Sequence, residues 1–213
     1  MKRKTRLMAA AIFLAALGGW TVMNDTQSAR AAEAADHTPE IATLGGGCFW
    51  CMEAVFEELN GVLKVESGFA GGVGPASYRE VCTGHTGHAE VIQVTYDPAV
   101  ISYNQILAVF FATHDPTSLN RQGADVGTQY RSAIFTSSDE QKRIAEEAIA
   151  KLERDGVFAK PVVTQVEPLK GFSKADEHHQ DYYRRNQNQG YCQVVINPKL
   201  AKFRREFSGM LKR

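Results

Sequence analysis

The sequence predicts a single domain in which a mixed β-sheet is covered by α-helices. The chain has 213 residues and 44% of them are apolar, which is enough for one sizeable core. Apolar patterns of period two, typical of strands, alternate along the chain with patterns of helical period. Neither an internal repeat nor a change of composition marks a second domain, so one layered fold accounts for the whole pattern.

The first elements follow from short apolar runs and glycines. Residues 41–44 form an apolar run that predicts a strand, and the three glycines at 45–47 predict a tight turn after it. Residues 49–59 have helical spacing, with one apolar face made by Met52, Val55, Phe56 and Leu59. Asn60-Gly61 ends this helix, and residues 63–69 then alternate as a strand does.

The middle of the domain contains a glycine-rich loop at 71–77 and a short helical turn at 78–82. Apolar alternation in 89–96 predicts a strand, and Ser102 caps a helix that runs to Thr113. The polar stretch 115–131 is long for a loop in a compact domain, and such loops are usually functional or mobile.

The last third repeats the alternation of strand and helix. Residues 132–136 predict a strand, and Ser138 with Gln141 forms the capping-box pattern of a helix that ends near Gly156. A strand at 162–167 and a helix at 175–186 follow. An irregular tail, which contains Cys192 and the basic segment 199–205, closes the chain.

The N-terminal segment 1–31 has the order of a secretory signal: a basic start, an apolar run and a small-residue cleavage site, Ala29-Arg30-Ala31. The apolar run, residues 7–20, has 14 residues and is shorter than the roughly 20 needed to span a bilayer. We therefore expect export to the periplasm or the medium, with an uncleaved membrane anchor or an organellar presequence as alternatives. Residues 32–40 are expected to be a flexible lead-in, and 41–213 the single catalytic domain.

The charge balance changes once this segment is set aside. The whole chain has 24 basic and 24 acidic residues, but residues 32–213 carry 19 basic and 23 acidic ones, a net charge of −4. This balance argues against nucleic-acid binding. Four cysteines are also too few for a disulfide scaffold at this length.

Cys48 is the first candidate for chemistry, because it follows the glycines at the predicted start of a helix. Unpaired N–H groups and the helix dipole stabilise a thiolate there, so we expect a lowered pKa and a nucleophilic sulfur. With Cys51 it makes a C-x-x-C pair, which also fits a thioredoxin-like redox site. A zinc site that adds His85 and His88 is a further alternative, although these histidines lie in a glycine-rich loop.

Three further side chains suit acid catalysis. Glu90 lies in the apolar strand 89–96, where partial burial would keep its carboxyl protonated and able to donate a proton. Tyr78 and Tyr130 can each donate a hydrogen bond without carrying charge. Tyr130 also ends the long polar loop, which favours a functional role for it.

Seven short motifs follow one another along nearly the whole domain. They are Gly47-Cys48-Phe49-Trp50, Tyr78-Arg79-Glu80-Val81-Cys82, Thr86-Gly87-His88-Ala89-Glu90, His114-Asp115-Pro116, Gly127-Thr128-Gln129-Tyr130-Arg131-Ser132, His179-Gln180-Asp181-Tyr182 and Gly190-Tyr191-Cys192. In this set the chain resembles the A-type peptide methionine sulfoxide reductases. The resemblance implies an α+β fold: a ferredoxin-like mixed sheet covered by helices, with long loops and an irregular C-terminal tail.

The resemblance also implies a reaction, the reduction of methionine S-sulfoxide, free or in oxidised proteins. Cys48 would attack the sulfoxide sulfur while Glu90 protonates the oxygen, and Tyr78 and Tyr130 would hydrogen-bond that oxygen. Methionine would leave a sulfenic acid on Cys48.

By the same resemblance, Phe49 and Trp50 would form an apolar pocket for the substrate methyl group, and Asp125 would position substrate or water. Cys192, which follows Gly190 in the tail, is the expected resolving cysteine, and Cys51, where relatives often have glycine, is the alternative. We read Cys82, beside apolar Val81, as a buried structural thiol. The expected enzyme is a monomer without metal or organic cofactor, recycled by thioredoxin or another external dithiol.

Overall fold

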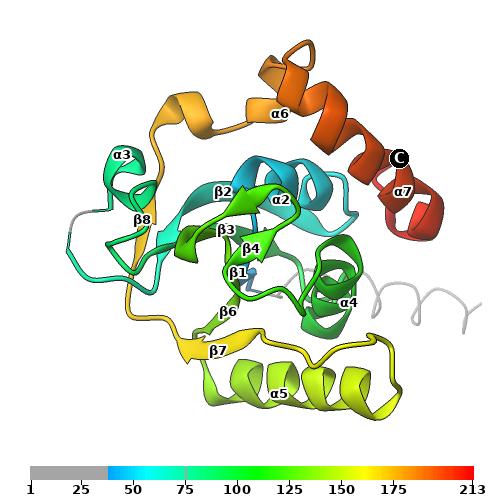
Figure 1. Cartoon of the computed structure of the whole chain (residues 1–213). Coiled ribbons are helices and arrows are strands. Elements are labelled where there is room, and N and C mark those ends of the chain that lie inside the picture. Colours follow the sequence, from blue (N-terminus) through cyan, green and yellow to red (C-terminus); the bar gives the residue numbers. More distant parts are fainter. Residues whose placement is uncertain (1–37, 75) are drawn as a thin grey trace, which may run out of the picture. The chain divides into compact units, whose positions relative to one another are not determined.

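A computed structural model provides the structure of the chain and describes residues 38–74 and 76–213 (Figure 1). The predicted signal segment and most of the predicted lead-in lie outside the described residues. The first strand begins at Glu40, whose side chain accepts a hydrogen bond of 2.6 Å from the Tyr96 hydroxyl. The first strand therefore begins one residue before the predicted start of the domain. Within the described ranges, each helix is too short or too polar to cross a membrane.

A βαββαβ core forms the centre of the domain. Its elements are β1 (Glu40–Gly46), α2 (Phe49–Phe56), β2 (Val62–Ala70), β3 (Ala89–Tyr96), α4 (Tyr103–Thr113) and β6 (Ser132–Thr136). The four strands lie in the order β6-β1-β3-β2 and are antiparallel throughout. This is the ferredoxin-like arrangement, as expected from the resemblance.

Two short strands extend this sheet to six. β7 (Gln165–Pro168) pairs parallel to β6 at one edge, and β8 (Phe172–Lys174) pairs antiparallel to β2 at the other. The sheet is therefore mixed, and the fold is α+β. α5 (Asp139–Arg154) packs beside α4 and against β6 and β7, below the sheet in Figure 1.

The main core lies between one face of the sheet and helices α2 and α4. β3 contributes Ile92 and Val94 to it, while Val91 points to a smaller cluster on the opposite face. Because side chains alternate along a strand, Glu90 lies on the same face as Ile92 and is directed toward α2. The sheet thus places an acid inside the apolar core layer.

Two insertions in the core carry loops toward the N-terminal end of α2. The first contains α3 (Tyr78–Val81), between β2 and β3. The second is the polar stretch after α4, which folds into a small hairpin of β4 (Arg121–Gln122) and β5 (Asp125–Val126) and a 3₁₀ turn, Thr128–Tyr130. The prediction that this stretch lacks long regular structure is confirmed, and it has an ordered hairpin at its centre.

The strand and helix predictions are largely confirmed, and capping explains two of the helix starts. Ser102 and Gln105 form a full capping box at α4, with hydrogen bonds in both directions. At α5, Ser138 accepts a bond from the Gln141 amide, but the Gln141 side chain accepts from Ser137 instead. Both helices begin where a serine oxygen accepts a bond from an otherwise unpaired N–H group.

Three local predictions are wrong: the turn at 45–47, the helix over 175–186 and the irregular tail. Gly45 and Gly46 belong to β1 and pair with β6, so the turn depends on Gly47 alone, whose φ is +95°. The expected helix over 175–186 is interrupted at Gln180, whose amide is used by the β2 backbone, and only a 3₁₀ turn, Glu177–His179, and α6 (Tyr182–Arg185) remain.

The expected irregular tail is instead largely helical. It forms a π-helical turn, Cys192–Ile196, that continues into α7 (Asn197–Glu206), drawn from orange to red in Figure 1. Ile196, Leu200 and Phe203 are buried in the main core, which explains why the segment is ordered. The cysteine in this segment is therefore part of a packed element.

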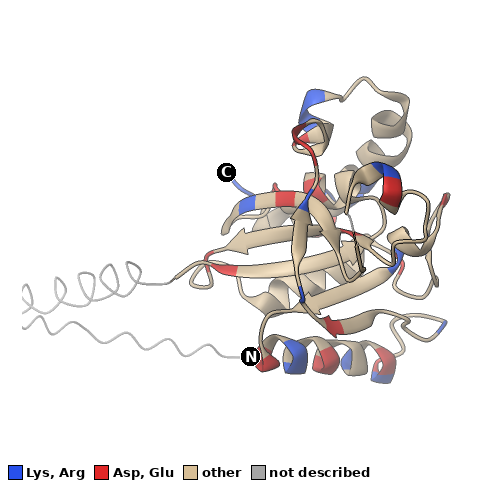
Figure 2. Cartoon of the chain, turned by 90° about the vertical axis from the view of Figure 1, so that its left-hand side faces the viewer, with Lys and Arg blue, Asp and Glu red and all other residues tan. Residues whose placement is uncertain are grey.

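Basic and acidic residues alternate along α5, the helix at the bottom of Figure 2. Arg143 pairs there with Glu140 and Glu147, and Lys151 pairs with Asp155. Pairs at this spacing lie on the solvent-facing side of the helix and contribute little to stability. They neutralise this face of the molecule.

Candidate active site

Cys48 occupies the N-cap position of α2, directly after the turn at Gly47. A side chain at position 47 would be strained, because a Cβ there would come within 2.5 Å of Gln122. The Cys51 backbone N–H donates to the Cys48 carbonyl at 3.1 Å, so the two cysteines lie one helical turn apart. The prediction that Cys48 starts a helix is confirmed.

Glu90 reaches the same helix end from β3. Its Oε2 atom accepts a hydrogen bond of 3.0 Å from the backbone N–H of Phe49, the residue after Cys48. The side chain is only 2% exposed. Burial raises its pKa to about 8 and outweighs the opposing effect of the Phe49 hydrogen bond, so the carboxyl is mostly protonated at neutral pH. This agrees with the role of proton donor expected from the sequence.

Tyr78 and Tyr130 approach Glu90 from the two insertions. Burial raises the pKa of each phenol, and the nearby Glu90 carboxylate adds to both shifts. Cys48 also contributes to the shift in the pKa of Tyr130. The structure therefore brings together all four side chains that were predicted to act on the substrate, and it keeps both phenols protonated as hydrogen-bond donors.

An aromatic cluster lies beside these groups. The Phe49 ring is buried and stacks with Tyr78 at 6.2 Å, while the Trp50 ring stacks with Tyr182 at 3.7 Å and an angle of 8°. His179 packs between them, with its centroid 4.2 Å from that of Tyr78. The rings of Phe49 and Trp50 lie 6.0 Å apart, and the rings of Tyr78, His179 and Tyr182 pack around them. That this cluster receives the substrate methyl group stays a prediction.

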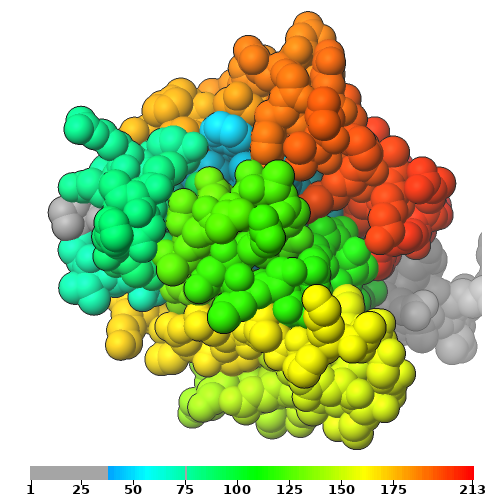
Figure 3. Space-filling view, viewed as in Figure 1, coloured from blue at the N-terminus to red at the C-terminus, as the bar shows by residue number. Residues whose placement is uncertain are grey.

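In the described part of the chain, three polar atoms of this cluster are buried without a hydrogen-bond partner. They are the Trp50 Nε1 and both ring nitrogens of His179. Buried polar atoms normally have partners, and exceptions often mark sites where a ligand binds. Figure 3 shows this region, where atoms of α2 in blue reach the surface between the teal, green and orange segments of the chain.

The acidities of the two neighbouring thiols differ from the sequence prediction. Burial raises the pKa of Cys48 well above its ordinary value, whereas a hydrogen bond with Cys48 lowers the pKa of Cys51 to about 7. The helix dipole was expected to lower the pKa of Cys48, but only 8% of this residue is exposed, and desolvation opposes the thiolate. Burial therefore disfavours the Cys48 thiolate in the resting enzyme, against the effect of the helix start.

Asp125 is connected to this thiol pair through the C-terminal segment. The Tyr191 hydroxyl donates a 2.8 Å hydrogen bond to Asp125 Oδ2, and it lies 3.6 Å from the Cys51 sulfur. The hairpin residue Asp125 is thus held near the thiol pair, and its role in positioning substrate or water stays a prediction. Tyr191 joins three segments that are distant in sequence: α2, β5 and the start of the helical tail.

The other two cysteines have different environments from those expected. Cys192 is fully buried in the helical segment, and its pKa is raised by burial and by the charge of Cys51. Cys82 was expected to be a buried structural thiol, but it is exposed. The reason is that α3 is a short surface helix in which only Val81 is buried.

The zinc alternative finds no matching geometry. His88 is tied into its own loop, where its Nδ1 accepts from the Gly72 N–H at 3.3 Å, and His85 is exposed. Among residues 38–74 and 76–213, no group of three or more histidine, cysteine or acidic side chains is placed to hold a metal ion.

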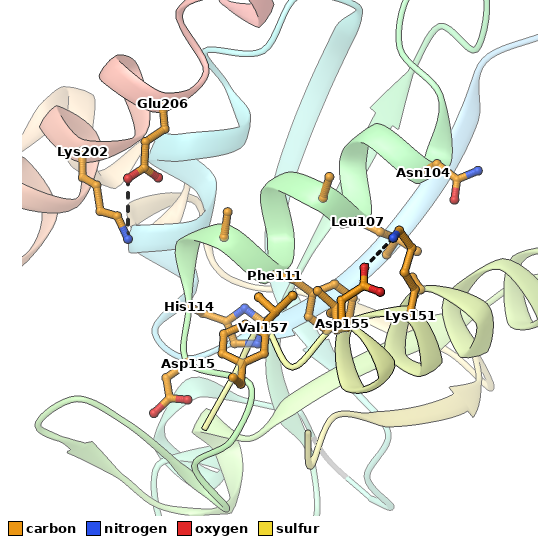
Figure 4. A pocket seen from close by; sticks show the side chains of 15 residues that line it. Asn104, Leu107, Phe111, His114, Asp115, Lys151, Asp155, Val157, Lys202 and Glu206 are labelled. Atoms are coloured by element: carbon orange, nitrogen blue, oxygen red, sulfur yellow. Dashed lines mark hydrogen bonds and ion pairs between the residues drawn. The ribbon is translucent and has the colours of Figure 1, made fainter. Parts of the chain in front are cut away.

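A separate groove of about 820 Å³ lies between α4, α5 and α7 (Figure 4). Its apolar lining includes Leu107, Phe111 and Val157, and the ion pair of Lys151 with Asp155 borders it. None of the predicted site residues lines this groove. The chemistry predicted from the sequence is therefore located elsewhere, at the N-terminus of α2.

Sequence reasoning assigned no role to three residues of the site, His179, Tyr182 and Tyr191. All three lie in the motifs His179-Gln180-Asp181-Tyr182 and Gly190-Tyr191-Cys192, so the clustering of aromatic and cysteine residues was the available signal. Glu53 was also missed. It is a carboxyl on the buried face of α2 with 1% exposure, and its position among apolar residues was a signal that could have identified it.

A cysteine with a second thiol one turn away and a protonated acid at the same helix end suits redox chemistry at sulfur. A cysteine hydrolase would instead need a general base beside the cysteine, where this site has the protonated Glu90. The fold and the site therefore define a cysteine-dependent oxidoreductase on a ferredoxin-like scaffold. The sequence profile described as Peptide methionine sulfoxide reductase matches residues 40–210. The chain belongs to this family, in its A type, and is a methionine sulfoxide reductase.

Similar proteins and structures agree. A peptide methionine sulfoxide reductase MsrA of Deinococcus radiodurans is 56% identical over 174 residues, which cover 81% of this chain and 84% of the relative. The crystal structure of reduced Mxr1 from Saccharomyces cerevisiae matches with a TM-score of 0.66 and 34% identity, over 72% of this chain and 89% of that one. Methionine sulfoxide reductase A of Corynebacterium diphtheriae matches with a TM-score of 0.65 and 36% identity, over 76% and 81%.

Proposed function

We propose that this enzyme repairs oxidised proteins, and also reduces free methionine sulfoxide, by attack of Cys48 on the sulfur of the S epimer. The observation that supports this best is the placement of Glu90. Its carboxyl is hydrogen-bonded to the residue after Cys48, and its pKa is about 8. A protonated acid beside a nucleophilic sulfur is what the transfer of a sulfoxide oxygen requires.

The proposed first step moves one oxygen atom and two electrons. The Cys48 sulfur bonds to the substrate sulfur while Glu90 donates its proton to the sulfoxide oxygen, and the phenols of Tyr78 and Tyr130 hydrogen-bond that oxygen. The sulfur–oxygen bond of the substrate then breaks, the oxygen bonds to the Cys48 sulfur, and the bond between the two sulfurs breaks with its electron pair left on methionine. Methionine is thus released reduced, Cys48 carries the oxygen as a sulfenic acid, and the proton of the original thiol replaces the one that Glu90 donated.

The aromatic cluster supports a binding mode for the substrate. The rings of Phe49 and Trp50 would contact the methyl group, and Asp125, which is held by the Tyr191 hydroxyl, would position the substrate or a water molecule. The apolar surface excludes water from the sulfur, which protects the intermediate and strengthens the hydrogen bonds to the oxygen.

In the proposed second step, Cys192 attacks the sulfenic acid to form a disulfide and release water, and a thioredoxin-type dithiol then reduces that disulfide. Because Cys192 is buried within a helical segment, this step requires the segment to move. Cys51 is the alternative resolving residue, since it lies one helical turn from Cys48 and has the lower pKa. No bound metal or organic cofactor is needed by this sequence of steps, and we propose a monomeric enzyme.

We further propose that the enzyme acts outside the cytoplasm, in the periplasm or the medium, or anchored by an uncleaved leader. The support is the order of basic, apolar and small residues in 1–31. Mass spectrometry of the chain recovered from its natural compartment tests this. Cleavage after Ala31 is expected, and an intact N-terminus in the cytoplasmic fraction would refute it.

The catalytic proposal is tested with separated sulfoxide epimers and a thioredoxin-type donor. Cys48→Ser is expected to abolish turnover of the S epimer, and Glu90→Gln to slow single-turnover sulfenic acid formation by about 100- to 1000-fold. Mapping of the disulfide after one turnover then identifies the resolving residue. A bond between Cys48 and Cys51 in which Cys192 takes no part would refute the assignment to Cys192.

The second candidate function is that of a C-x-x-C thiol-disulfide oxidoreductase, which the lowered pKa of Cys51 favours. Such an enzyme reduces protein disulfides without any sulfoxide present. An insulin reduction assay distinguishes the two functions, and we expect sulfoxide turnover with no significant reduction of insulin.

A further inference from the structure

We propose that Glu53 is a positioning residue of the substrate pocket, which acts by holding the backbone of Tyr182 so that the Tyr182 ring stays against Trp50. Neither the family resemblance nor the reaction steps above assign it a role. The inference depends on the proposed function, because it concerns the pocket for methionine sulfoxide.

Glu53 is a buried acid without a buried base. It lies on α2 one turn after Phe49, and only 1% of its surface is exposed. Among the residues that the structure describes, no lysine or arginine forms an ion pair with it, and Arg184 pairs with Glu57 and Asp181 instead. A buried carboxyl that lacks an ion-pair partner must be satisfied by hydrogen bonds instead.

The partners of Glu53 are hydrogen-bond donors from two other segments, one 14 and the other 129 positions away in the sequence. Its Oε1 accepts a bond of 3.2 Å from the Ser67 hydroxyl on β2, and its Oε2 accepts one of 3.1 Å from the Tyr182 backbone N–H. The Tyr182 bond reaches the first residue of α6, where the helix leaves an N–H group unpaired. Glu53 thus connects the catalytic helix to the start of α6.

The segment before Tyr182 is held on its other side, so that Glu53 completes a rigid connection. The Gln180 side chain exchanges two hydrogen bonds of 2.9 Å with the backbone of Ser67. Between Gln180 and Tyr182, Asp181 has a left-handed conformation with φ +49°, which is unfavourable for a residue with a side chain. Such a conformation persists only where its surroundings impose it.

The connection ends at the pocket. The ring of Tyr182 lies parallel to the indole of Trp50 at 3.7 Å, and Trp50 is the residue that would contact the substrate methyl group. α6 is a single turn whose residues are not fully buried, so it has little packing of its own. Without the Glu53 carboxylate, the Tyr182 N–H would lose its partner, and the left-handed turn would relax and carry the ring away from Trp50.

Kinetics and fluorescence together test this inference. Glu53→Ala is expected to raise the KM for methionine sulfoxide about tenfold, with kcat changed by less than about twofold, because binding is weakened while the reacting groups stay in place. Glu53→Gln, which keeps an acceptor oxygen, should have a KM close to that of the wild type. In a full chain that carries Trp20→Phe, Trp50 is the only tryptophan, and Glu53→Ala should change its emission.

A double-mutant cycle separates positioning from general stability. Tyr182→Ala should raise KM by itself, and adding Glu53→Ala to it should then change KM by less than about twofold. Glu58→Ala is the matched control, since Glu58 binds Arg204 at 2.9 Å, whereas the hydrogen bonds of Tyr182 in the described part of the chain go to Glu53 and Asn186. We expect a normal KM and normal Trp50 emission for this variant.

Several results would overturn the inference. They are a normal KM in Glu53→Ala, additive effects of the Glu53 and Tyr182 changes, or unaltered Trp50 emission. If Glu53→Ala does not fold, Glu53→Met fills the space without accepting a hydrogen bond, and failure of both variants to fold would assign Glu53 to folding alone. A wild-type chain without sulfoxide turnover would instead refute the proposed function, so the two failures are distinguishable.

Discussion

Replacing Glu90 by Gln is expected to make the protein more stable while it removes the proposed catalytic acid. Glu90 is 2% exposed and its folded-state pKa is about 8, against an ordinary value of 4.5. The folded protein therefore holds a proton on Glu90 that the unfolded chain releases between pH 4.5 and 8. Stability is fully present below pH 4.5 and falls as the pH rises through this window.

The size of the effect follows from the two pKa values. By linkage between protonation and folding, Glu90 lowers the free energy of unfolding by about 1 kcal/mol at pH 5, about 3 kcal/mol at pH 7 and about 5 kcal/mol at pH 8.5. A glutamine carries no charge at any of these values, and its oxygen can still accept the bond from the Phe49 N–H. The stability gained in Glu90→Gln should therefore increase with pH.

Urea unfolding of both proteins at pH 5, 7 and 8.5, followed by circular dichroism, measures this difference directly. Glu53 and Glu57 also have raised pKa values, but they are present in both proteins and cancel in the comparison. A variant that is less stable than the wild type at pH 8.5, or a difference that does not change with pH, would refute the burial argument. It would also weaken the case that Glu90 is protonated when it meets the substrate.

Three other changes have definite expected outcomes. Gly47→Ala should lower the free energy of unfolding by about 1–2 kcal/mol, because φ is +95° there, and it should reduce kcat/KM; unchanged activity would show that the turn does not set the position of Cys48. Phe110→Ala should lower the free energy of unfolding by about 3–5 kcal/mol in a urea titration, since the ring is fully buried. A decrease of less than about 1 kcal/mol would contradict this. Burial lowers the pKa of His114 to about 4, so the free energy of unfolding should fall by about 3 kcal/mol as the pH drops from 6.5 to 4. His114→Gln should not show this loss, and equal acid sensitivity in both proteins would contradict the burial of a neutral His114.

Most of the fold was predictable because its strands and helices carry strong local patterns. The limits of β3 and β6 agree with the predicted ones, since apolar alternation and burial coincide there. The failures came where a distant residue decided the local conformation. The helix expected over 175–186 is interrupted because Gln180 uses its side chain to bind the β2 backbone. The tail is ordered because Leu200 and Phe203 pack into the main core. Together with Ile196 they have the spacing of an apolar helix face, a local signal that the sequence prediction of an irregular tail did not use.

The candidate site shows the same division. The residue types and their spacing predicted Cys48, Glu90, Tyr78 and Tyr130, and the structure brings these together at one end of α2. The protonation of the two thiols could not be predicted, because it depends on how much water reaches each sulfur. Burial of Cys48 reversed the shift in pKa that its position at a helix start implied.

By itself, the sequence determined the family and the order of most strands and helices, and it predicted a nucleophile and an acid, because each depends on a residue type or on a short pattern. Only the tertiary structure decided that Cys192 is buried in a helix, that Cys82 is exposed, and that Glu53 connects α2 to Tyr182. The physical reason is that burial and hydrogen bonding are properties of neighbours in space. Such neighbours are separated here by more than a hundred positions along the chain.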